Sequence, residues 1–342
     1  MPHNRKRLLG LAALGLSAML AFTACSGQAP AATEEAAESS TSAPPLNVGL
    51  FVANAFGDHS YYDAAHATIE QLEGEFGATV STYEGKLETQ NYGPLLQDAA
   101  DANELVYVVG NQAVDAAAQA AAQNPDTTFV FLNGFVPGGD VVSATFRYQE
   151  NCYAGGTVAA LVSADTGATA VGFMGGFETP PMADCEAGLA QGVHAQDESI
   201  SIVSRYVGSF SEPAKGLETA VALGQAGAHV ILAFAGLSAQ GALGAVDSGT
   251  DIAPIMASWS EVPEASPAIL NDDVGVLMLD VAQRFVDGSL ERGSAKSYGF
   301  AEGAFVVQYN DRFLSAEQQQ EVDDVIAQIV AGSITPEGAP RS

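Results

Sequence analysis

The stretch LVYVVGNQAVDAAAQAAAQNPDTTFVFL, residues 105–132, decides the fold. Leu105–Val109 is a short run of β-branched, aliphatic and aromatic residues, which favours a buried strand. Ala113–Gln123 is rich in alanine, the residue that most favours a helix, and Thr127–Leu132 is a second strand-like run. Two strands joined by such a helix form a βαβ unit, in which the strands lie parallel.

The same alternation runs along most of the chain from Leu46 onward. Further strands are expected at Asn47–Ala53, Ala78–Tyr83, Val141–Arg147, Ala168–Met174, Ile200–Val207, His229–Phe234 and Pro254–Ser258. Further helices are expected at Tyr62–Glu75, Cys152–Ser163, Ala183–Ala195, Glu212–Gln225, Asp273–Asp287 and Ala316–Ala331. One open sheet with this many strands would be unusually large. We therefore expect an α/β protein with two lobes, each a doubly wound parallel sheet flanked by helices.

Several helix ends carry matching local chemistry. Gly77 and Gly227 follow expected helix ends, where a left-handed residue is favoured. Ser211 precedes Glu212 and Pro213, so we expect Ser211 to cap a helix that has proline in its first turn.

The N-terminus has the pattern of an export signal. Arg5, Lys6 and Arg7 precede the apolar run 8–22, which is shorter than the roughly 20 residues that a membrane-spanning helix needs. Small residues then lead to Cys25, a pattern that resembles the lipobox of bacterial lipoproteins. Residues 1–24 are therefore interpreted as a signal peptide and Cys25 as the lipidated residue of a protein held on the outer face of the cell membrane. The alternative is an ordinary cleaved signal with an incidental cysteine.

Residues 26–45 have the composition of a tether. The segment SGQAPAATEEAAESSTSAPP has no aromatic or large aliphatic side chain, so it cannot bury enough surface to offset the entropy of ordering. We expect Cys25 and this flexible tether to hold a folded body away from the membrane.

The charge of the chain restricts its partners. It has 41 acidic and 12 basic residues, a formal net charge of −29. Nucleic acid or an anionic membrane surface is therefore an unsuitable partner. Solubility outside the cell explains this acidity without a specific cation site.

Two cysteines remain in the body once Cys25 is set aside. An oxidising compartment favours a disulfide between Cys152 and Cys185, and we prefer it over two buried free thiols. The sequence alone does not measure the Cα separation on which a bridge depends.

Several motifs, in this order and spacing, resemble the basic-membrane-protein family, the nucleoside-receptor lipoproteins of ABC importers. They read GDHSYY at 57–62, SATFR at 143–147, ENCYAG at 150–155, VGFMGG at 171–176, SFSEPAKG at 209–216 and AG at 235–236. The resemblance implies a type I periplasmic-binding fold that closes on a small solute and delivers it to an ABC permease. It also implies that no chemical step and no cofactor are involved.

The resemblance implies that the chain crosses between lobes near Tyr148, near Trp259 and after Asp287. The first lobe would contain residues 46–148 plus about 259–288. The second would contain residues 149–258 plus about 289–335.

The loop after the first strand is a candidate wall of the ligand site. Tyr61 corresponds to the family's stacking aromatic, Tyr62 replaces an amide, and Phe56 is a further stacking candidate. Packing between helix and sheet would also explain these rings. Asp58 is a polar candidate that would equally well cap the following helix.

Other candidates follow later strands. Asn111 follows one strand end, whereas Phe234 ends another and lies close to Gly236. Core packing is an equal alternative for Phe234. Ser258 and Asn271 align with the family's sugar-binding carboxylate and lysine, so we expect neutral groups to hold any sugar more weakly.

An enzyme is disfavoured. The histidines are scattered without metal-ligand spacing, and no nucleophile elbow, Walker loop or zinc-protease motif is present. The main alternatives are a lipoprotein that senses a ligand for a membrane signalling partner, and a receptor for a solute other than a nucleoside.

Overall fold

The stretch at residues 105–132 forms the expected βαβ unit. In the computed structural model, which describes residues 46–57 and 61–340, strand β3 (Leu105–Val109) lies parallel to β4 (Thr128–Leu132). Helix α4 (Val114–Gln123) connects them after a 3₁₀ turn, η1 (Asn111–Ala113). Every residue of β3 is buried, as expected for a central strand covered on both faces.

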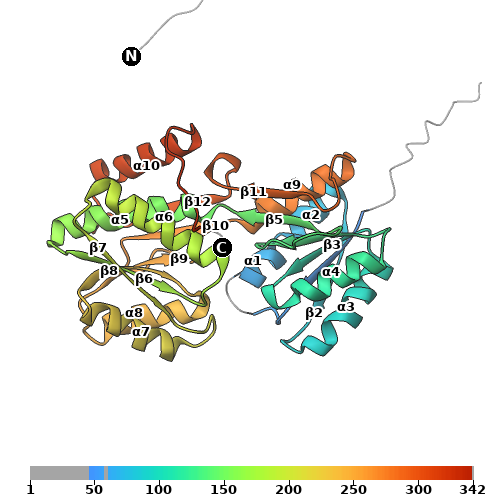
Figure 1. The fold of residues 1–342 in the computed structure, drawn as a ribbon, viewed down its shortest axis with the longest axis horizontal. Coiled ribbons are helices and arrows are strands. Elements are labelled where there is room, and N and C mark those ends of the chain that lie inside the picture. The colour runs from blue at the N-terminus through green and yellow to red at the C-terminus, as the bar shows by residue number, and fades with distance from the viewer. Residues whose placement is uncertain (1–45, 58–60, 341–342) are drawn as a thin grey trace, which may run out of the picture. The chain divides into compact units, whose positions relative to one another are not determined.

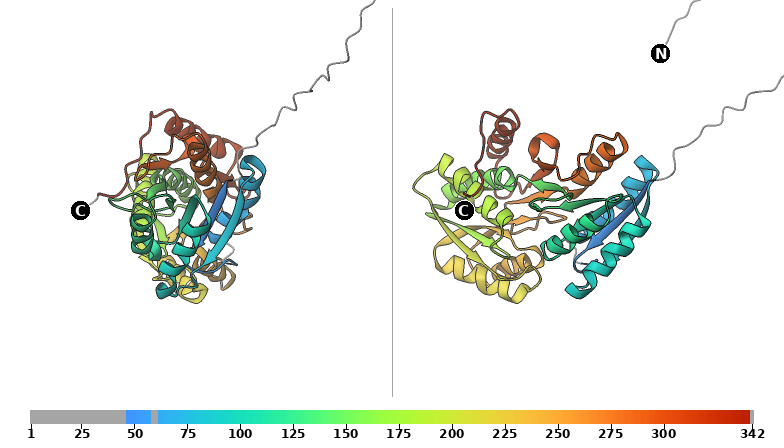
Figure 2. Two further views of the ribbon diagram at one scale, coloured as in Figure 1. Left: turned by 90° about the vertical axis from the view of Figure 1, so that its right-hand side faces the viewer. Right: turned by 45° about the vertical axis from the view of Figure 1, so that its right-hand side comes forward.

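The first sheet has six parallel strands in the order β11-β5-β4-β3-β1-β2. Its other strands are β1 (Asn47–Val52), β2 (Thr79–Glu84), β5 (Val142–Phe146) and β11 (Ala295–Tyr298). Alternate residues of β1 and β3 face opposite layers: one layer contains α2 (Ile69–Phe76) and α9 (Val274–Val286), and the other contains α3 (Thr89–Ala102) and α4. Helix α1 (Tyr61–Ala67) lies against α9. Figure 2 shows the cyan and teal helices on one face of this sheet and the orange α9 on the other. This sheet and these helices form the first lobe.

The second sheet repeats the same strand order, β12-β10-β9-β8-β6-β7. Its strands are β6 (Ala170–Gly175), β7 (Ser201–Tyr206), β8 (Ala228–Phe234), β9 (Ala253–Ala257), β10 (Ala268–Asp272) and the antiparallel β12 (Phe305–Tyr309). One face packs on α5 (Tyr148–Thr166) and α6 (Pro180–Gln196), and the other on η2 (Gly236–Ala239), α7 (Pro213–Gln225) and α8 (Gln240–Asp247). Helix α10 (Ala316–Val330) packs on α5, and η3 (Phe300–Glu302) precedes β12. This second lobe confirms the expected fold class (Figure 1).

All the strands expected from the sequence form, but three others were missed. Strand β10 ends in Asn271 and Asp272, β11 includes Lys296 and β12 includes Gln308, so these runs lack the continuous apolar character of an equally short strand such as β3. The single helix expected at Tyr62–Glu75 is divided into α1 and α2 at Thr68. The Thr68 hydroxyl donates to the Ala64 carbonyl oxygen, a bond that competes with regular helix.

The structure also corrects one helix cap. Gly77 and Gly227 are left-handed, as expected. However, the N-cap of α7 is Glu212 and not Ser211. The Glu212 amide donates to the hydroxyl of Ser238, 26 residues away, so a tertiary contact replaces the expected local cap.

The second and third crossings between the lobes lie at other residues than the sequence analysis expected. Because β10 pairs with β9, the chain stays in the second sheet beyond Trp259 and leaves it only after β10. Because β11 pairs with β5, the chain is still in the first sheet after Asp287, and it crosses again after Tyr298. The difference arises from the two short strands that the sequence pattern does not indicate.

Helices α5 and α6 touch backbone to backbone. A Cβ atom added to Gly192 would lie 2.1 Å from the Tyr153 carbonyl oxygen, and one added to Gly156 would lie 2.4 Å from the Leu189 carbonyl oxygen. A disulfide joins Cys152 of α5 to Cys185 of α6, with the Cα atoms 5.1 Å apart. The bridge is the alternative that we favoured over two free thiols.

Replacing Gly192 with alanine tests this close packing. We expect Gly192→Ala to lower the free energy of unfolding by about 1–3 kcal/mol, because a methyl group has no space at the contact. Urea denaturation measures the effect. The matched control is Gly74→Ala on α2, where an added Cβ meets nothing within 4 Å, so helix propensity should stabilise that variant by up to about 1 kcal/mol. Equal stability of the two variants would contradict the packing argument.

Candidate functional site

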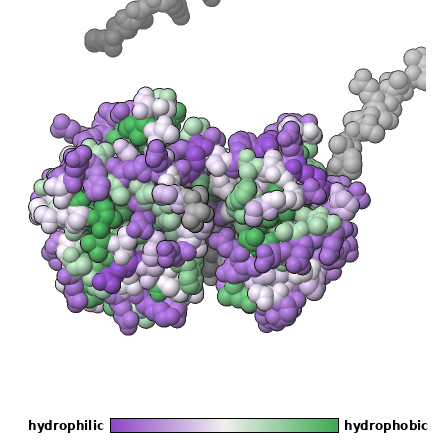
Figure 3. Space-filling view, in the orientation of Figure 1, coloured by the Kyte–Doolittle hydropathy of each residue, from purple (hydrophilic) through white to green (hydrophobic). Residues whose placement is uncertain are grey.

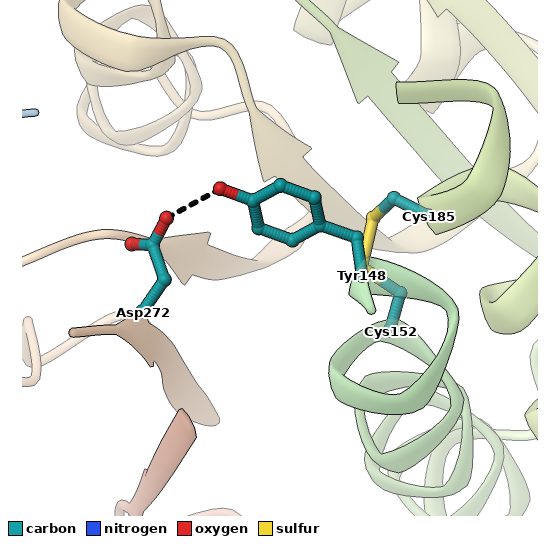
Figure 4. The surroundings of a disulfide bond; sticks show 4 residues. All are labelled: Tyr148, Cys152, Cys185 and Asp272. Carbon is teal, nitrogen blue, oxygen red and sulfur yellow. Dashed lines mark hydrogen bonds between the residues drawn. A yellow bond between two sulfur atoms is a disulfide. The ribbon is translucent and has the colours of Figure 1, made fainter. Parts of the chain in front are cut away.

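Tyr148 is the first residue of α5 and lies directly after β5, at the first crossing between lobes. Its phenol donates a hydrogen bond of 2.6 Å to Oδ2 of Asp272 and accepts one of 3.1 Å from Nδ2 of Asn133. Asn133 follows β4 of the first sheet, whereas Asp272 ends β10 of the second. Tyr148 therefore links polar groups from both lobes at the carboxyl ends of their strands, and Figure 4 shows its ring pointing toward Asp272.

Figure 4 also shows the disulfide just beyond Tyr148. Tyr148 and Cys152 are four residues apart on α5, so their side chains lie on the same face of the helix. The bridge from Cys152 to Cys185 thus fixes the turn of α5 that carries the Tyr148 ring.

Asp272 carries the charge of this cluster. Ser258, which follows β9 in a left-handed conformation (φ 55°), donates its hydroxyl to Oδ1 of Asp272. Burial raises the pKa of the Asp272 carboxyl above its usual value, although the hydrogen bonds from Ser258 and Tyr148 oppose the shift. Among the described residues, no lysine, arginine or histidine forms an ion pair with Asp272.

Two buried polar atoms near Asp272 have no hydrogen-bond partner. They are the Tyr61 hydroxyl and Oδ1 of Asn133. Burial and the nearby charge of Asp272 raise the pKa of Tyr61 well above its usual value, so its phenol stays protonated. Because a buried polar atom without a partner costs roughly 1–3 kcal/mol, such atoms in a native fold require an explanation.

Aromatic rings surround the polar groups. Phe234, at the end of β8, packs edge-on against Tyr148 with ring centroids 5.0 Å apart. Phe146 lies 5.3 Å from Tyr148 and 6.5 Å from Tyr61, and Phe305 lies 5.5 Å from Phe146. We call the set of Tyr61, Asn133, Phe146, Tyr148, Phe234, Ser258, Asp272 and Phe305 the crossing cluster.

The crossing cluster contains three of the residues that the sequence analysis selected: Tyr61, Phe234 and Ser258. Asn271 points elsewhere, because successive strand residues face opposite sides, and its Oδ1 accepts from the Trp259 amide at 2.8 Å. Asp272, one residue further on, thus places a carboxylate beside Ser258, where we had expected only neutral groups.

The remaining selected residues lie around the cluster or beyond the described part of the chain. The Phe56 ring packs on His66, with centroids 4.6 Å apart. A Cβ added to Gly110 would lie 3.0 Å from the Tyr62 hydroxyl, so this tyrosine reaches the end of β3. Asn111 is exposed, and Gly236 is left-handed at the start of η2. Asp58 and Cys25 lie outside the described residues.

The sequence analysis missed Tyr148, Asp272 and Asn133. Asn133 follows a recognised strand, so the rule that selected Asn111 would also have selected Asn133. Asp272 was hidden because β10 was not recognised. Tyr148 was treated only as a boundary between lobes.

A network of charged groups fixes the backbone at the first and last crossings. The Arg147 guanidinium pairs with Glu150 and, at 2.6 Å, with Glu302, and its backbone amide donates to the Tyr298 carbonyl oxygen at 2.7 Å. A Cβ added to Gly299 would lie 2.0 Å from Glu150 Oε2, so a side chain has no space there. Arg147 therefore joins two separate crossings of the chain.

The described residues also include two surface hollows, both on the second lobe. One, of about 590 Å³, lies beside Asp247, Glu264 and Arg312. The other, of about 670 Å³, lies between α6 and the edge strand β7. Neither is lined by a member of the crossing cluster.

Within the described chain, no group of three or more His, Cys, Asp or Glu side chains could hold a metal ion. No helix in residues 46–57 and 61–340 is long and apolar enough to cross a membrane. Figure 3 shows mostly hydrophilic residues on the face drawn there.

Residues 46–337 match the family model described as "ABC transporter substrate-binding protein PnrA-like". The chain belongs to this family. Its match covers the whole two-lobed body, including every residue of the crossing cluster.

The body of this PnrA-like protein is similar to several curated relatives. Basic membrane protein A of Borreliella burgdorferi is 26% identical over 325 residues, which cover 91% of this chain and 90% of the relative. The "ABC transporter nucleoside-binding protein BmpA" of Lactococcus lactis is 26% identical over a region that covers 68% of this chain and 66% of the relative. An uncharacterized lipoprotein of Pyrococcus abyssi is also 26% identical, over a region that covers 84% of this chain and 74% of the relative.

Solved structures share the fold. A solute-binding protein of an ABC transporter system from Aeropyrum pernix superimposes with a TM-score of 0.75 and 21% identity, covering 87% of this chain and 94% of its own. A transcriptional activator of the comK gene from Bacillus halodurans gives a TM-score of 0.70 and 22% identity, over 85% and 99% of the two chains. At these identities the similarity establishes the fold alone.

Removing the Tyr148 hydroxyl tests whether it joins the cluster. We expect Tyr148→Phe to lower the free energy of unfolding by about 1–3 kcal/mol, because Asp272 and Asn133 both lose a buried partner. Tyr153→Phe, the same change five residues further along α5, removes no hydrogen bond made by the Tyr153 hydroxyl and should be nearly neutral. Urea denaturation of both variants measures the difference, and equal effects would contradict the role given to Tyr148.

Proposed function

We propose that this substrate-binding protein is a lipid-anchored receptor that captures a small, planar, hydroxylated solute of the nucleoside class between its lobes. It then delivers the solute to an ABC permease. The observation that supports this best is the crossing cluster, in which hydrogen-bonding groups of both sheets converge beside aromatic rings. The ligands of such α/β sheets bind at the carboxyl ends of the strands, where this cluster lies.

The chemistry of the cluster matches a sugar hydroxyl joined to a planar ring. Asn133 Oδ1 and the remaining lone pairs of Asp272 accept hydrogen bonds, and the Tyr61 hydroxyl can donate or accept one. Phe234 and the neighbouring rings offer apolar surface to a base. A relative from Lactococcus lactis is named a nucleoside-binding protein, which supports the same solute class.

The mechanism is binding and closure. Tyr148 touches Asn133 of the first sheet and Asp272 of the second, so a solute placed against them would contact both lobes at once. A solute that makes these contacts only in the closed arrangement shifts the population toward closure. No bond is made or broken in the solute, and no cofactor takes part.

A panel of candidate solutes tests the nucleoside class. We expect purine and pyrimidine nucleosides to raise the melting temperature of the body, residues 44–342, which is a compact unit. The stabilisation should grow with ligand concentration, because the ligand binds only the folded state. Free bases, ribose and unrelated sugars serve as comparisons. Stabilisation by another solute class and by no nucleoside would refute the assignment.

The variant Tyr61→Phe tests whether the bound solute contacts the crossing cluster. In Tyr61→Phe we expect the stability without ligand to be unchanged or higher, because the buried hydroxyl has no protein partner to lose. Its affinity for a bound nucleoside should fall about tenfold, as a hydrogen bond worth roughly 1.4 kcal/mol is lost. Tyr153→Phe is the control that should change neither property.

The lipid anchor requires its own test. The run that ends at Cys25 and the lipoprotein names among the relatives support acylation at this residue. We expect Cys25→Ala in the full chain to abolish labelling by a fatty-acid analogue and to release the protein from the membrane fraction. A Cys152→Ala, Cys185→Ala double variant controls for labelling of other cysteines. Unchanged labelling of Cys25→Ala would contradict lipidation.

A further inference from the structure

The Asp272 carboxylate is partly buried, and the groups that bind it are neutral. Its two hydrogen bonds come from the hydroxyls of Ser258 and Tyr148. The cations of the neighbouring crossing are already paired, since Arg147 binds Glu150 and Glu302, and Lys296 binds Asp280. Because even a partly buried charge without an ion pair costs free energy, Asp272 is not the residue that folding alone would favour at this position.

The free hydrogen-bonding capacity around Asp272 is mainly that of acceptors. Oδ1 of Asn133 and the carboxylate both accept, whereas the Tyr61 hydroxyl and the second N–H of the Asn133 amide can donate. A solute group that satisfies this set must therefore supply several N–H or O–H donors. A phosphate or carboxylate supplies only acceptors at neutral pH and adds like-charge repulsion with Asp272.

We propose that Asp272 determines the charge of the solute: the group that enters the crossing cluster donates hydrogen bonds and carries no negative charge, whereas phosphorylated and carboxylated solutes are rejected. A vicinal diol or a protonated amine fits this description. The inference rests on the proposed receptor function and makes Asp272 a specificity-determining residue.

The role of Asp272 also predicts the stability of the protein without ligand. If Asp272 is present for the solute, its charge is a cost to the empty protein. Replacing it with asparagine removes the charge and keeps the shape, and an amide can still accept from one hydroxyl and donate to the other. Asp272→Asn should therefore melt at the same temperature as the unaltered protein or higher, while it binds solute less tightly.

The experiment combines both consequences on the body, residues 44–342. Isothermal titration with adenosine, adenosine 3′-monophosphate and adenosine 5′-monophosphate measures the charge preference. Thermal melting without ligand measures the cost of the charge. The control variant is Asp273→Asn, which removes the adjacent, exposed charge, and asparagine retains the N-cap that Asp273 provides to the Gly275 amide.

We expect the unaltered protein to bind adenosine at least about 100-fold more tightly than either monophosphate. In Asp272→Asn, adenosine affinity should fall about tenfold, because a hydrogen bond to a charged group is replaced by a neutral one. The preference over the monophosphates should shrink by at least about tenfold. Asp273→Asn should leave the affinity and the preference unchanged.

Three results would overturn the inference. The first is equal affinity of the unaltered protein for adenosine and its monophosphates. The second is an undiminished preference in Asp272→Asn. The third is a lower melting temperature of ligand-free Asp272→Asn than of the unaltered protein. If no nucleoside binds the unaltered protein, the assignment of a nucleoside as the solute is wrong. The melting comparison then decides on the role of Asp272 by itself.

Discussion

The hydrogen bond from Tyr148 to Asp272 is the interaction on which the arrangement of the two lobes most depends. It connects the residue at which the chain first leaves one sheet with the residue at which it leaves the other. Asn133 extends the connection to the end of β4. The three groups lie where strands of both sheets end, so one short network joins the two lobes at the crossing cluster.

The rigidity of that network comes from the helices behind it. Helices α5 and α6 approach so closely that glycine is required at the contact, and the disulfide joins them one turn from Tyr148. On the other side of the crossing, Arg147 holds the first and last connecting segments together through Glu150 and Glu302. The hydrogen bonds from the Gly299 amide and Arg147 outweigh the effect of burial and hold the pKa of Glu302 below its usual value. These contacts order the crossings, whereas Tyr61 and Asn133 each retain a buried polar atom without a partner.

This division between satisfied and unsatisfied groups relates structure to function. The cores of both sheets are mostly apolar, and central strands such as β3 and β6 are buried on both faces. In the crossing cluster, by contrast, two buried polar atoms without partners, the Tyr61 hydroxyl and Asn133 Oδ1, lie near a carboxylate without an ion pair. A receptor that must release its solute benefits from such a site, because groups that are fully satisfied without a ligand would gain nothing from binding one.

The sequence by itself determined the fold class, most strands and helices, and the family. Runs such as Leu105–Val109 are long and apolar enough to specify a buried strand locally, and the order of the family motifs along the chain does not depend on folding. The candidate site was only partly accessible: Tyr61, Phe234 and Ser258 were selected, but Asp272 and Tyr148 were not. Asp272 ends a five-residue strand that pairs with β9 and β12, and Tyr148 acquires its role from a carboxylate 124 residues away. Local patterns encode local structure, whereas the partners of a buried polar group are set by which strand ends the tertiary fold brings together.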